Sequence, residues 1–364
     1  MSGVDTDVLV VGQGIHGLAT AASLARRGVD VIGLDRFTPG HARGSSHGRT
    51  RMIRRAYPNP VWNDLVDRAW TGWEALEAAG GETLIHRTGG LYAHAGAAQL
   101  QGPGCRAVSE RGEMEALMPG FVVPEGYGAV SDPSAGVIEA ERAQTVLRAE
   151  ATRHGADLRG GVDVLGWERD AGGVLVRTDQ GELRARRLVL AGGSWMSSLV
   201  PALAPLLEVW RILTLTVAAG QEAGIPPMLG AFSVDRAEGL VFGIPDADGN
   251  GVKLGVDARD VWDPEIPVAA PDEAETAALQ RLLSTFVPGL DPAPVEAAAC
   301  LYTMTADKRF ILGPLTDAPE VVVVSACSGH GFKFGPAVGD AAADLALGVE
   351  RPDLDFISTT RRGL

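Results

Sequence analysis

The chain has 364 residues, of which 46% are hydrophobic and 21% charged, and its formal net charge is −14. This length predicts two folded domains, or one large α/β unit with a second domain inserted. The acidic balance argues against nucleic acid or an anionic membrane as the main partner, since either would need a basic face. Three widely spaced cysteines predict neither a disulfide framework nor a metal site.

The start of the chain and its hydropathy bear on location. The opening "MSGVDTD" lacks the basic residues of a signal peptide. No apolar run approaches the roughly 18 residues that a bilayer-spanning helix needs. We therefore expect a cytoplasmic protein without a membrane partner.

The first predicted unit binds a nucleotide. An apolar strand over residues 7–11 leads into a GxGxxG turn and a helix over residues 15–27, and a second strand, 29–34, ends on Asp35. In such units the three glycines, here Gly12, Gly14 and Gly17, allow the tight turn, the approach of a pyrophosphate and close helix packing. The helix N-terminus favours phosphate, and Asp35 accepts ribose hydroxyls. This order predicts dinucleotide binding, although the turn alone does not separate FAD from NAD.

The next segment is unusually basic. "GSSHGRTRMIRRAY", residues 44–57, carries four arginines and no acid. Such a cluster in an acidic protein is either a solvated loop or a set of cations facing a flavin, a phosphate or a substrate carboxylate. Residues 61–79 follow with the apolar spacing of an amphipathic helix, whose tryptophans we expect in the core.

The rest of the chain predicts a discontinuous nucleotide domain. A helix over 139–154, a hairpin and a strand over 188–191 lead to the turn at 192–195, which offers a second backbone approach to a nucleotide. Alternating strands from about 205 to 300 predict an antiparallel sheet, and the end returns to a buried strand, a glycine-rich turn and a helix. The expected fold is α/β, a Rossmann-like domain (1–85, 140–205 and 296–364) with an inserted antiparallel-sheet substrate domain (86–139 and 206–295).

Six motifs together resemble one family. The glycine turn, "GSSHGRTRMIRRAY", "AGGSW", "GVKLG", "ACLYTMT" and "SGHGFKFGP" occur in the order found in the monomeric sarcosine oxidase and N-methyltryptophan oxidase family of D-amino-acid-oxidase-like flavoenzymes. The similarity covers nearly the whole chain and implies FAD as the cofactor. It also implies oxidation of a secondary-amine amino acid, N-methyl or cyclic, with hydride passing to flavin, an imine product and reduction of O2 to hydrogen peroxide.

The resemblance also assigns roles to residues. Arg54 and Lys333 match the ligands of the substrate carboxylate, His47 and Arg51 match positions beside the flavin ring, and Lys253 matches the lysine that activates dioxygen. Strand alternation supports a special role for Lys253, because the apolar residues on either side of it point to the opposite face. Arg49 and Arg55 receive no role and are expected to be solvated or structural.

Cofactor contacts follow in the same way. Cys300, in "AACLYT", matches the cysteine that links the flavin covalently, whereas Cys105 and Cys327 match no motif and are expected to be core thiols. The helix near Pro336 would present its positive end to reduced flavin. The full set of expected FAD-binding positions is Gly12, Gly14, Ile15, His16, Gly17, Asp35, Arg36, Ser45, Arg51, Val164, Gly192, Trp195, Cys300, Gly329, Gly331, Phe332 and Lys333.

The substrate pocket departs from the family pattern. A histidine of sarcosine-oxidising members is replaced by Asp257, a pocket tyrosine by Phe242 and an entrance methionine by Ser233, while Tyr302 keeps a family aromatic. If Asp257 faces the pocket, it favours a substrate with an additional amine or several hydroxyls; otherwise it is a solvent-facing residue at a strand end. Sarcosine itself is therefore not the expected substrate.

Several alternatives stay open. Within the enzyme class they are a fructosyl amino acid (deglycating) oxidase and a biosynthetic cyclic imino acid oxidase. "VGDAA", residues 338–342, echoes the Gly-Asp pair of flavin hydroxylases, although it lies inside a predicted helix. A flavin-binding redox sensor without turnover is the alternative from another class. The expected partners are a small amino acid and O2, with no metal, and the expected assembly is a monomer or weak dimer.

Overall fold

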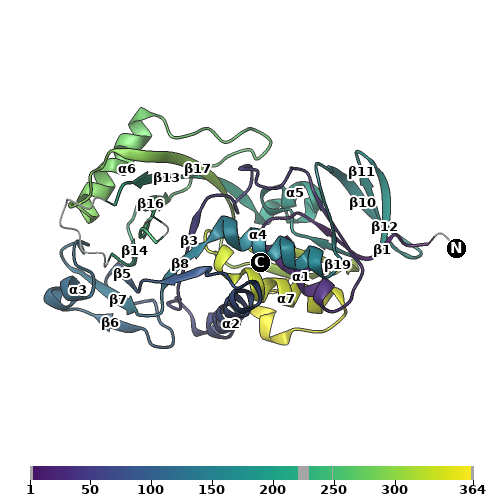
Figure 1. The fold of residues 1–364 in the computed structure, drawn as a ribbon, viewed down its shortest axis with the longest axis horizontal. Coiled ribbons are helices and arrows are strands. Elements are labelled where there is room, and N and C mark those ends of the chain that lie inside the picture. Colours follow the sequence, from purple (N-terminus) through teal and green to yellow (C-terminus); the bar gives the residue numbers. More distant parts are fainter. Residues whose placement is uncertain (1–2, 220–228, 248, 362–364) are drawn as a thin grey trace.

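The computed structural model describes residues 3–219, 229–247 and 249–361. Two large sheets lie side by side (Figure 1), one carrying the N-terminal unit and the other lying beside the helices α3 and α6. A small third sheet connects them. No helix in the described ranges is both long and apolar enough to cross a membrane.

The first sheet has a parallel centre. β1 pairs in parallel with β2 on one side and β12 on the other, and β12 pairs in parallel with β19. β1 is buried along nearly all of its length, as expected for a strand covered on both faces. The strands are β1 (Thr6–Val11), β2 (Val31–Asp35), β9 (Asp157–Gly160), β10 (Val164–Asp170), β11 (Gly173–Thr178), β12 (Gly181–Leu190), β18 (Ile311–Leu315) and β19 (Ala318–Ser325).

Helices pack closely against this sheet. α1 lies against α7 and α4, and α2 lies against α7 (Figure 1). A side chain at Gly339 of α7 would collide with Ala19 of α1, so the glycine permits their close crossing. The bounds are α1 (Ile15–Arg26), α2 (Asn63–Gly80), α4 (Ala140–Arg153), α5 (Met196–Leu199) and α7 (Gly335–Ala346).

The second sheet is mainly antiparallel and has its own core. Leu279, Leu283 and Phe286 of α6 pack with Leu215 and Leu254 from the sheet. One pair, β5 with β14, is parallel. The elements are β5 (Gly90–Ala95), β6 (Arg106–Val108), β7 (Tyr127–Asp132), β13 (Glu208–Val217), β14 (Ala231–Val234), β15 (Leu240–Ile244), β16 (Val252–Asp257), β17 (Pro294–Met304), α3 (Arg111–Leu117) and α6 (Glu273–Phe286).

The third sheet joins the arginine-rich segment to the rest of the molecule. β3 (Thr50–Ile53) pairs with β8 (Gly136–Glu139), which also pairs with β4 (Ile85–Arg87). Short 3-10 turns occupy Pro60–Trp62, Gly193–Trp195, Pro201–Leu206, Phe332–Phe334 and Pro352–Ile357.

The expected fold class, an α/β nucleotide-binding domain with an antiparallel-sheet domain, is confirmed. The strand pairing crosses the expected domain limits at β8, which pairs with β3 although the two were assigned to different domains, and again at β17. β17 pairs with β13 along its length, so residues 296–304, which the sequence assigns to the nucleotide domain, belong to the second sheet. A long strand near the end of an inserted domain carries no local signal of which sheet it joins.

Candidate active site

One cavity of about 1330 Å³ connects the glycine turn with the second sheet. Its lining begins at Gly12 and Asp35 and extends to Phe242, Tyr302 and Lys333. Residues far apart in the sequence therefore share one space, and both large sheets contribute to it. This is the arrangement expected of a ligand held between two domains.

The glycine turn is built for close backbone approach. Gly12 has φ +95°, and a Cβ there would collide with the carbonyl oxygen of Ala191. A Cβ at Gly17 would overlap with the carbonyl oxygen of Gly12. Gly12 and Gly14 line the cavity, whereas Gly17 is buried behind them and serves packing.

The acid after β2 is held at this turn. Asp35 Oδ2 accepts a hydrogen bond from the backbone N–H of Gln13 at 2.6 Å, and its Oδ1 accepts one from Phe37 at 2.8 Å. Gln13 Oε1 in turn accepts a hydrogen bond from Arg148 of α4 at 2.7 Å. Arg148 also lines the cavity, and sequence analysis missed it because nothing local distinguishes an arginine on an amphipathic helix.

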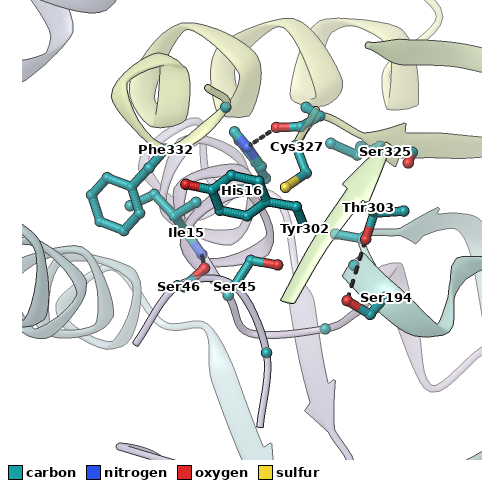
Figure 2. Close-up of a pocket in the computed structure, with 18 of the residues that line it drawn as sticks. Ile15, His16, Ser45, Ser46, Ser194, Tyr302, Thr303, Ser325, Cys327 and Phe332 are labelled. Carbon is teal, nitrogen blue, oxygen red and sulfur yellow. Dashed lines mark hydrogen bonds between the residues drawn. The ribbon is translucent and has the colours of Figure 1, made fainter. Parts of the chain in front are cut away.

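The N-terminus of α1 meets the basic segment (Figure 2). Ser46 Oγ accepts a hydrogen bond from the Ile15 backbone N–H at 3.1 Å, and Ser45 lies beside it. His16 Nε2 donates to the Ala326 carbonyl at 2.8 Å, and burial lowers the pKa of His16 to about 4. His16 is therefore neutral near pH 7, and its Nδ1 is buried without a partner in the described structure.

Arg51 and His47 organise the loop that they belong to. The Arg51 guanidinium donates to the carbonyls of Ser45 at 2.8 Å and Thr50 at 2.9 Å, and lies 5.5 Å from the Phe332 ring centroid. His47 Nδ1 donates to the Gly44 carbonyl at 2.8 Å. Burial, reinforced by the charge of Arg51, lowers the pKa of His47 to about 4. Both side chains line the cavity, and His47 is neutral near pH 7.

The four arginines of the segment have different surroundings. Arg51 and Arg54 line the cavity. Arg49 is exposed and contacts the Asn250 carbonyl, while Arg55 pairs with Asp67 and lies 5.4 Å from the Trp70 ring centroid. The basic segment is thus part cavity wall and part outer structure.

Two cations meet at the far end of the cavity. Arg54 is partly buried, and Lys333 is 7% exposed, with its Nζ donating to the His330 carbonyl at 2.8 Å. Burial, together with the nearby Arg54 charge, holds the pKa of Lys333 well below its usual range. Within the described residues, neither cation has a carboxylate within ion-pair distance, so this end of the cavity attracts an anion.

Two predicted site residues lie behind the cavity wall. Lys253 and Cys300 are not among the described residues that line it. Lys253 Nζ donates to the Thr50 carbonyl at 2.7 Å, across to β3. Burial raises the pKa of the Cys300 thiol, and the charges of Arg51 and Lys253 lower it, which places all three close together. Cys327, expected to be a core thiol, instead lines the cavity beside Tyr302 (Figure 2).

Asp257 faces the cavity rather than the solvent. Its side chain is 10% exposed, Oδ2 lies 3.6 Å from Lys308 Nζ, and Oδ1 is buried without a hydrogen-bond partner in the described structure. Burial raises the pKa of Asp257, which Lys308 opposes. Lys308 has φ +55°, an uncommon conformation for a non-glycine residue. Phe242, Tyr302 and Ser233 line the same region.

The remaining predicted cofactor positions also line the cavity. Arg36 lies between the two domains, pairing with Asp163 at 3.3 Å and Glu265 at 2.8 Å. The buried Trp195 Nε1 has no partner among the described residues. The others are Val164, Gly192, Gly329, Gly331 and Phe332.

The comparisons with known proteins decide the family. The family model described as FAD dependent oxidoreductase (DAO) matches residues 7–345. The chain belongs to this family. As a member, it is 30% identical to monomeric sarcosine oxidase of Bacillus sp. (strain B-0618), with 98% of this chain and 96% of the relative covered. It is 31% identical to N-methyl-L-tryptophan oxidase of Yersinia pestis (strain Pestoides F), with 98% and 100% covered.

A solved structure of an amino acid oxidase is also similar to this chain over its whole length. The open form of NikD, an unusual amino acid oxidase essential for nikkomycin biosynthesis, has a TM-score of 0.83 and 28% identity, covering 100% of this chain and 99% of that chain. The family predicted from the six motifs is confirmed, and FAD is the cofactor of this oxidoreductase.

The residues of this FAD-dependent oxidoreductase fit the cofactor. Gly12 and Gly14 line the cavity at the N-terminus of α1, where a pyrophosphate would bind, Asp35 lines it where ribose hydroxyls would bind, and the buried Trp195 indole N–H has no hydrogen-bond partner among the described residues. The hydroxylase alternative lacks such support. Asp340 of "VGDAA" pairs with Arg26 at 3.2 Å on the outer side of α7, and neither it nor Gly339 lines the cavity.

Proposed function

We propose that this FAD-dependent oxidoreductase oxidises the secondary amine of an α-amino acid, N-methyl or cyclic, to an imine and reduces O2 to hydrogen peroxide. The observation that carries the proposal is the convergence of Arg54 and Lys333 on one cavity with the glycine turn. When bound, FAD would accept the two electrons lost as the amine C–N bond is oxidised to an imine, and dioxygen would then take these electrons from it.

Arg54 and Lys333 would hold the substrate by its carboxylate. A guanidinium can donate two parallel hydrogen bonds to a carboxylate, which fixes its orientation, while an ammonium adds a compact charge. Histidines near the site are neutral: burial, reinforced by the Lys333 charge, lowers the pKa of His330 to about 3. No strong general base is required, because the neutral amine form of the substrate can be selected from solution.

Lys253, His47 and Arg51 would act on the reactive ring of FAD rather than on the substrate carboxylate. Lys253 presents a cation held by the Thr50 carbonyl, and a fixed cation stabilises negative charge that develops on dioxygen. Arg51 fixes the 45–50 loop through backbone carbonyls. Its charge is therefore held in place before any ligand arrives.

We further infer that Cys300 is the point of covalent FAD attachment. Arg51 and Lys253 stabilise its thiolate against the effect of burial. Cys327 is the natural control, because it is the cysteine that lines the cavity. Acid precipitation should leave a yellow pellet from the parent and from Cys327→Ala and a colourless pellet from Cys300→Ala. The reverse pattern would move the attachment to Cys327.

Asp257 limits the range of possible substrates. Asp257 lines the cavity, and its Oδ1, which has no hydrogen-bond partner in the described structure, would accept a hydrogen bond from a hydroxyl or ammonium group on the substrate side chain. This feature favours as the second candidate a fructosyl amino acid oxidase, whose sugar carries several hydroxyls. A cyclic imino acid with a donor group would use the same oxygen.

The test is anaerobic reduction of the bound flavin, followed as loss of its visible absorbance. The reductants are α-N-methyl amino acids, proline and pipecolate, fructosyl amino acids and NADPH. Rapid bleaching by one amine class, with peroxide formed on admitting air, is the expected result. Bleaching by NADPH alone, or by none of them, would contradict an amine oxidase and support the hydroxylase or the sensor.

An arginine pair provides the control for carboxylate binding. Arg54→Met should raise the KM of the reactive amine about a hundredfold, because a charge-assisted bidentate pair is lost. Arg49→Met, which removes an exposed arginine of the same segment, should leave KM unchanged. Equal effects of the two substitutions would show that only the net charge of the segment matters.

A further inference from the structure

The guanidinium of Arg54 lies over two aromatic rings. Its Cζ is 5.1 Å from the ring centroid of Tyr57 and 5.2 Å from that of Tyr92. Both rings are almost completely buried, at 2% and 1% exposure. Both distances are within the range in which the negative face of an aromatic ring attracts a cation, and burial strengthens that attraction.

The described structure gives Arg54 no other support. No described residue accepts a hydrogen bond from the Arg54 guanidinium, and no described carboxylate forms an ion pair with it. Asp132, a fully buried acid whose charge acts on Tyr92, is already occupied. Its Oδ2 accepts hydrogen bonds from the backbone N–H groups of Arg55 at 2.6 Å and Ala56 at 3.1 Å. Asp132 therefore fixes the main chain just after Arg54 and leaves the guanidinium to the rings.

Tyr57 also connects Arg54 to the second cation. Lys333 Nζ lies 5.9 Å from the Tyr57 ring centroid. Tyr57 itself is held by its hydroxyl, which donates to His330 Nδ1 at 3.3 Å, while His330 Nε2 donates to the Lys308 carbonyl at 2.9 Å. One ring thus lies close to both basic side chains, and no described carboxylate pairs with either of them.

Tyr92 contributes its ring and not its hydroxyl. It lies on β5, paired on both sides with β14 and β7, so its backbone is fixed by the second sheet. The hydroxyl is buried and has no hydrogen-bond partner in the described chain. Tyr92 does not line the cavity, so it can act on a ligand only through a neighbouring side chain, and Arg54 is the cavity-lining cation over its ring.

We propose that Tyr57 and Tyr92 form an aromatic clamp that positions Arg54 for a substrate carboxylate, with Tyr92 acting wholly through Arg54. The inference rests on the proposed function, because it assumes that Arg54 binds the carboxylate. The two ring contacts use none of the guanidinium N–H donors, which have no acceptor among the described residues and therefore stay available to the anion. A carboxylate in place of the clamp would compete with the substrate.

The clamp is tested with acetate, the simplest carboxylate, by calorimetric titration of the holoenzyme. Tyr92→Leu should weaken acetate binding about tenfold, and Tyr92→Phe should restore affinity to within about twofold of the parent, because the ring is retained. With an amine substrate, Tyr92→Leu should raise KM about tenfold and change kcat less than twofold. FAD content and melting temperature show whether each variant is folded, and Tyr92→Met replaces Tyr92→Leu if the latter is not.

A double-mutant cycle separates this inference from the proposed function. In an Arg54→Met background, Tyr92→Leu should cause no further loss of acetate affinity. If Arg54→Met does not weaken acetate binding, the carboxylate site itself is wrong. If Arg54→Met weakens binding but Tyr92→Leu does not, only the clamp is wrong. A Tyr92→Leu effect that persists in the Arg54→Met background would also overturn the clamp, because it would show a merely structural role.

Discussion

The two ends of the cavity differ in how their polar groups are satisfied. At the glycine turn, Asp35 accepts two backbone hydrogen bonds and the Ile15 N–H already has Ser46 as its acceptor. At the far end, Arg54 is held by aromatic rings and Asp257 keeps a buried oxygen without a partner in the described structure. We therefore expect the first end to select its ligand by shape and by backbone hydrogen bonds, and the second end to select its ligand by charge. Substitutions should therefore remove the cofactor at one end and change substrate affinity at the other.

The largest effect is expected where shape matters most. Gly17→Val would place a branched side chain on the Gly12 carbonyl oxygen, and overpacking of this kind costs about 1–3 kcal/mol or more. We expect purified protein with almost no FAD and a lower melting temperature, measured by absorbance per chain and thermal unfolding. Gly112→Ala, where a Cβ meets nothing within 4 Å, is the control. Full FAD content in Gly17→Val would refute the predicted close approach.

The next effect concerns dioxygen. Lys253→Met should leave anaerobic reduction by substrate nearly unchanged and slow reoxidation about 100-fold, the loss typical of removing one preorganised electrostatic contact. Stopped-flow mixing of reduced enzyme with oxygenated buffer measures it. Lys308→Met removes a lysine that lines the cavity at the Asp257 end, and it should reoxidise at the parent rate. Reoxidation of Lys253→Met at the parent rate would remove the assignment.

The next prediction concerns Asp257 and the selectivity for a substrate with a second ammonium group. For α-N-methyl-lysine against α-N-methyl-norleucine, which differ in one ammonium group, Asp257→Asn should lower the kcat/KM ratio about tenfold. A hydrogen bond to a charged group contributes about 1.5–3 kcal/mol, and a factor of ten corresponds to about 1.4 kcal/mol. Lys308→Met should raise the same ratio, because it frees the other carboxylate oxygen. A ratio unchanged in both variants would mean that Asp257 does not contact the substrate.

The same difference explains what the sequence could predict. The turn from Gly12 to Gly17 and the acid at Asp35 belong to one continuous strand–helix–strand unit, and the geometry of that unit sets their spacing. The far end combines Arg54, just after β3, with Tyr92 of β5 and Asp257 of β16, so no local pattern brings them together. The family motifs predict the roles of Arg54 and Lys333, but not which side chains surround them.

Cys327 and Tyr92 show which features of the site cannot be predicted from the sequence. Cys327 matches no family motif and was therefore expected to be a core thiol, yet β19 ends just before it, at Ser325, and the following turn faces the cavity. Tyr92 looks like an ordinary strand aromatic, and its effect on Arg54 depends on the pairing of β5 with β14. Both depend on tertiary arrangement.

The smallest effect is a proton taken up when the anion binds. Burial and the charge of Arg54 hold the pKa of Lys333 below its usual range, and a bound carboxylate would raise it. Between these two pKa values Lys333 is partly neutral in the free enzyme and charged in the complex, so binding takes up a proton. Acetate affinity should then fall as pH rises, by no more than tenfold per pH unit.

Calorimetry in buffers of different ionisation enthalpy measures this uptake directly. The neighbouring histidines do not contribute above about pH 6, because the pKa of His330 lies at about 3 and that of His47 at about 4. Lys333→Met should bind acetate more weakly and with no proton uptake. Proton uptake that is unchanged in Lys333→Met would assign it to another group, and none in the parent would mean that Lys333 keeps its charge in the empty site. In either case the protonation state of Lys333 would not change when the anion binds. The substrate end of the cavity would then be arranged before its ligand binds, as the glycine turn is.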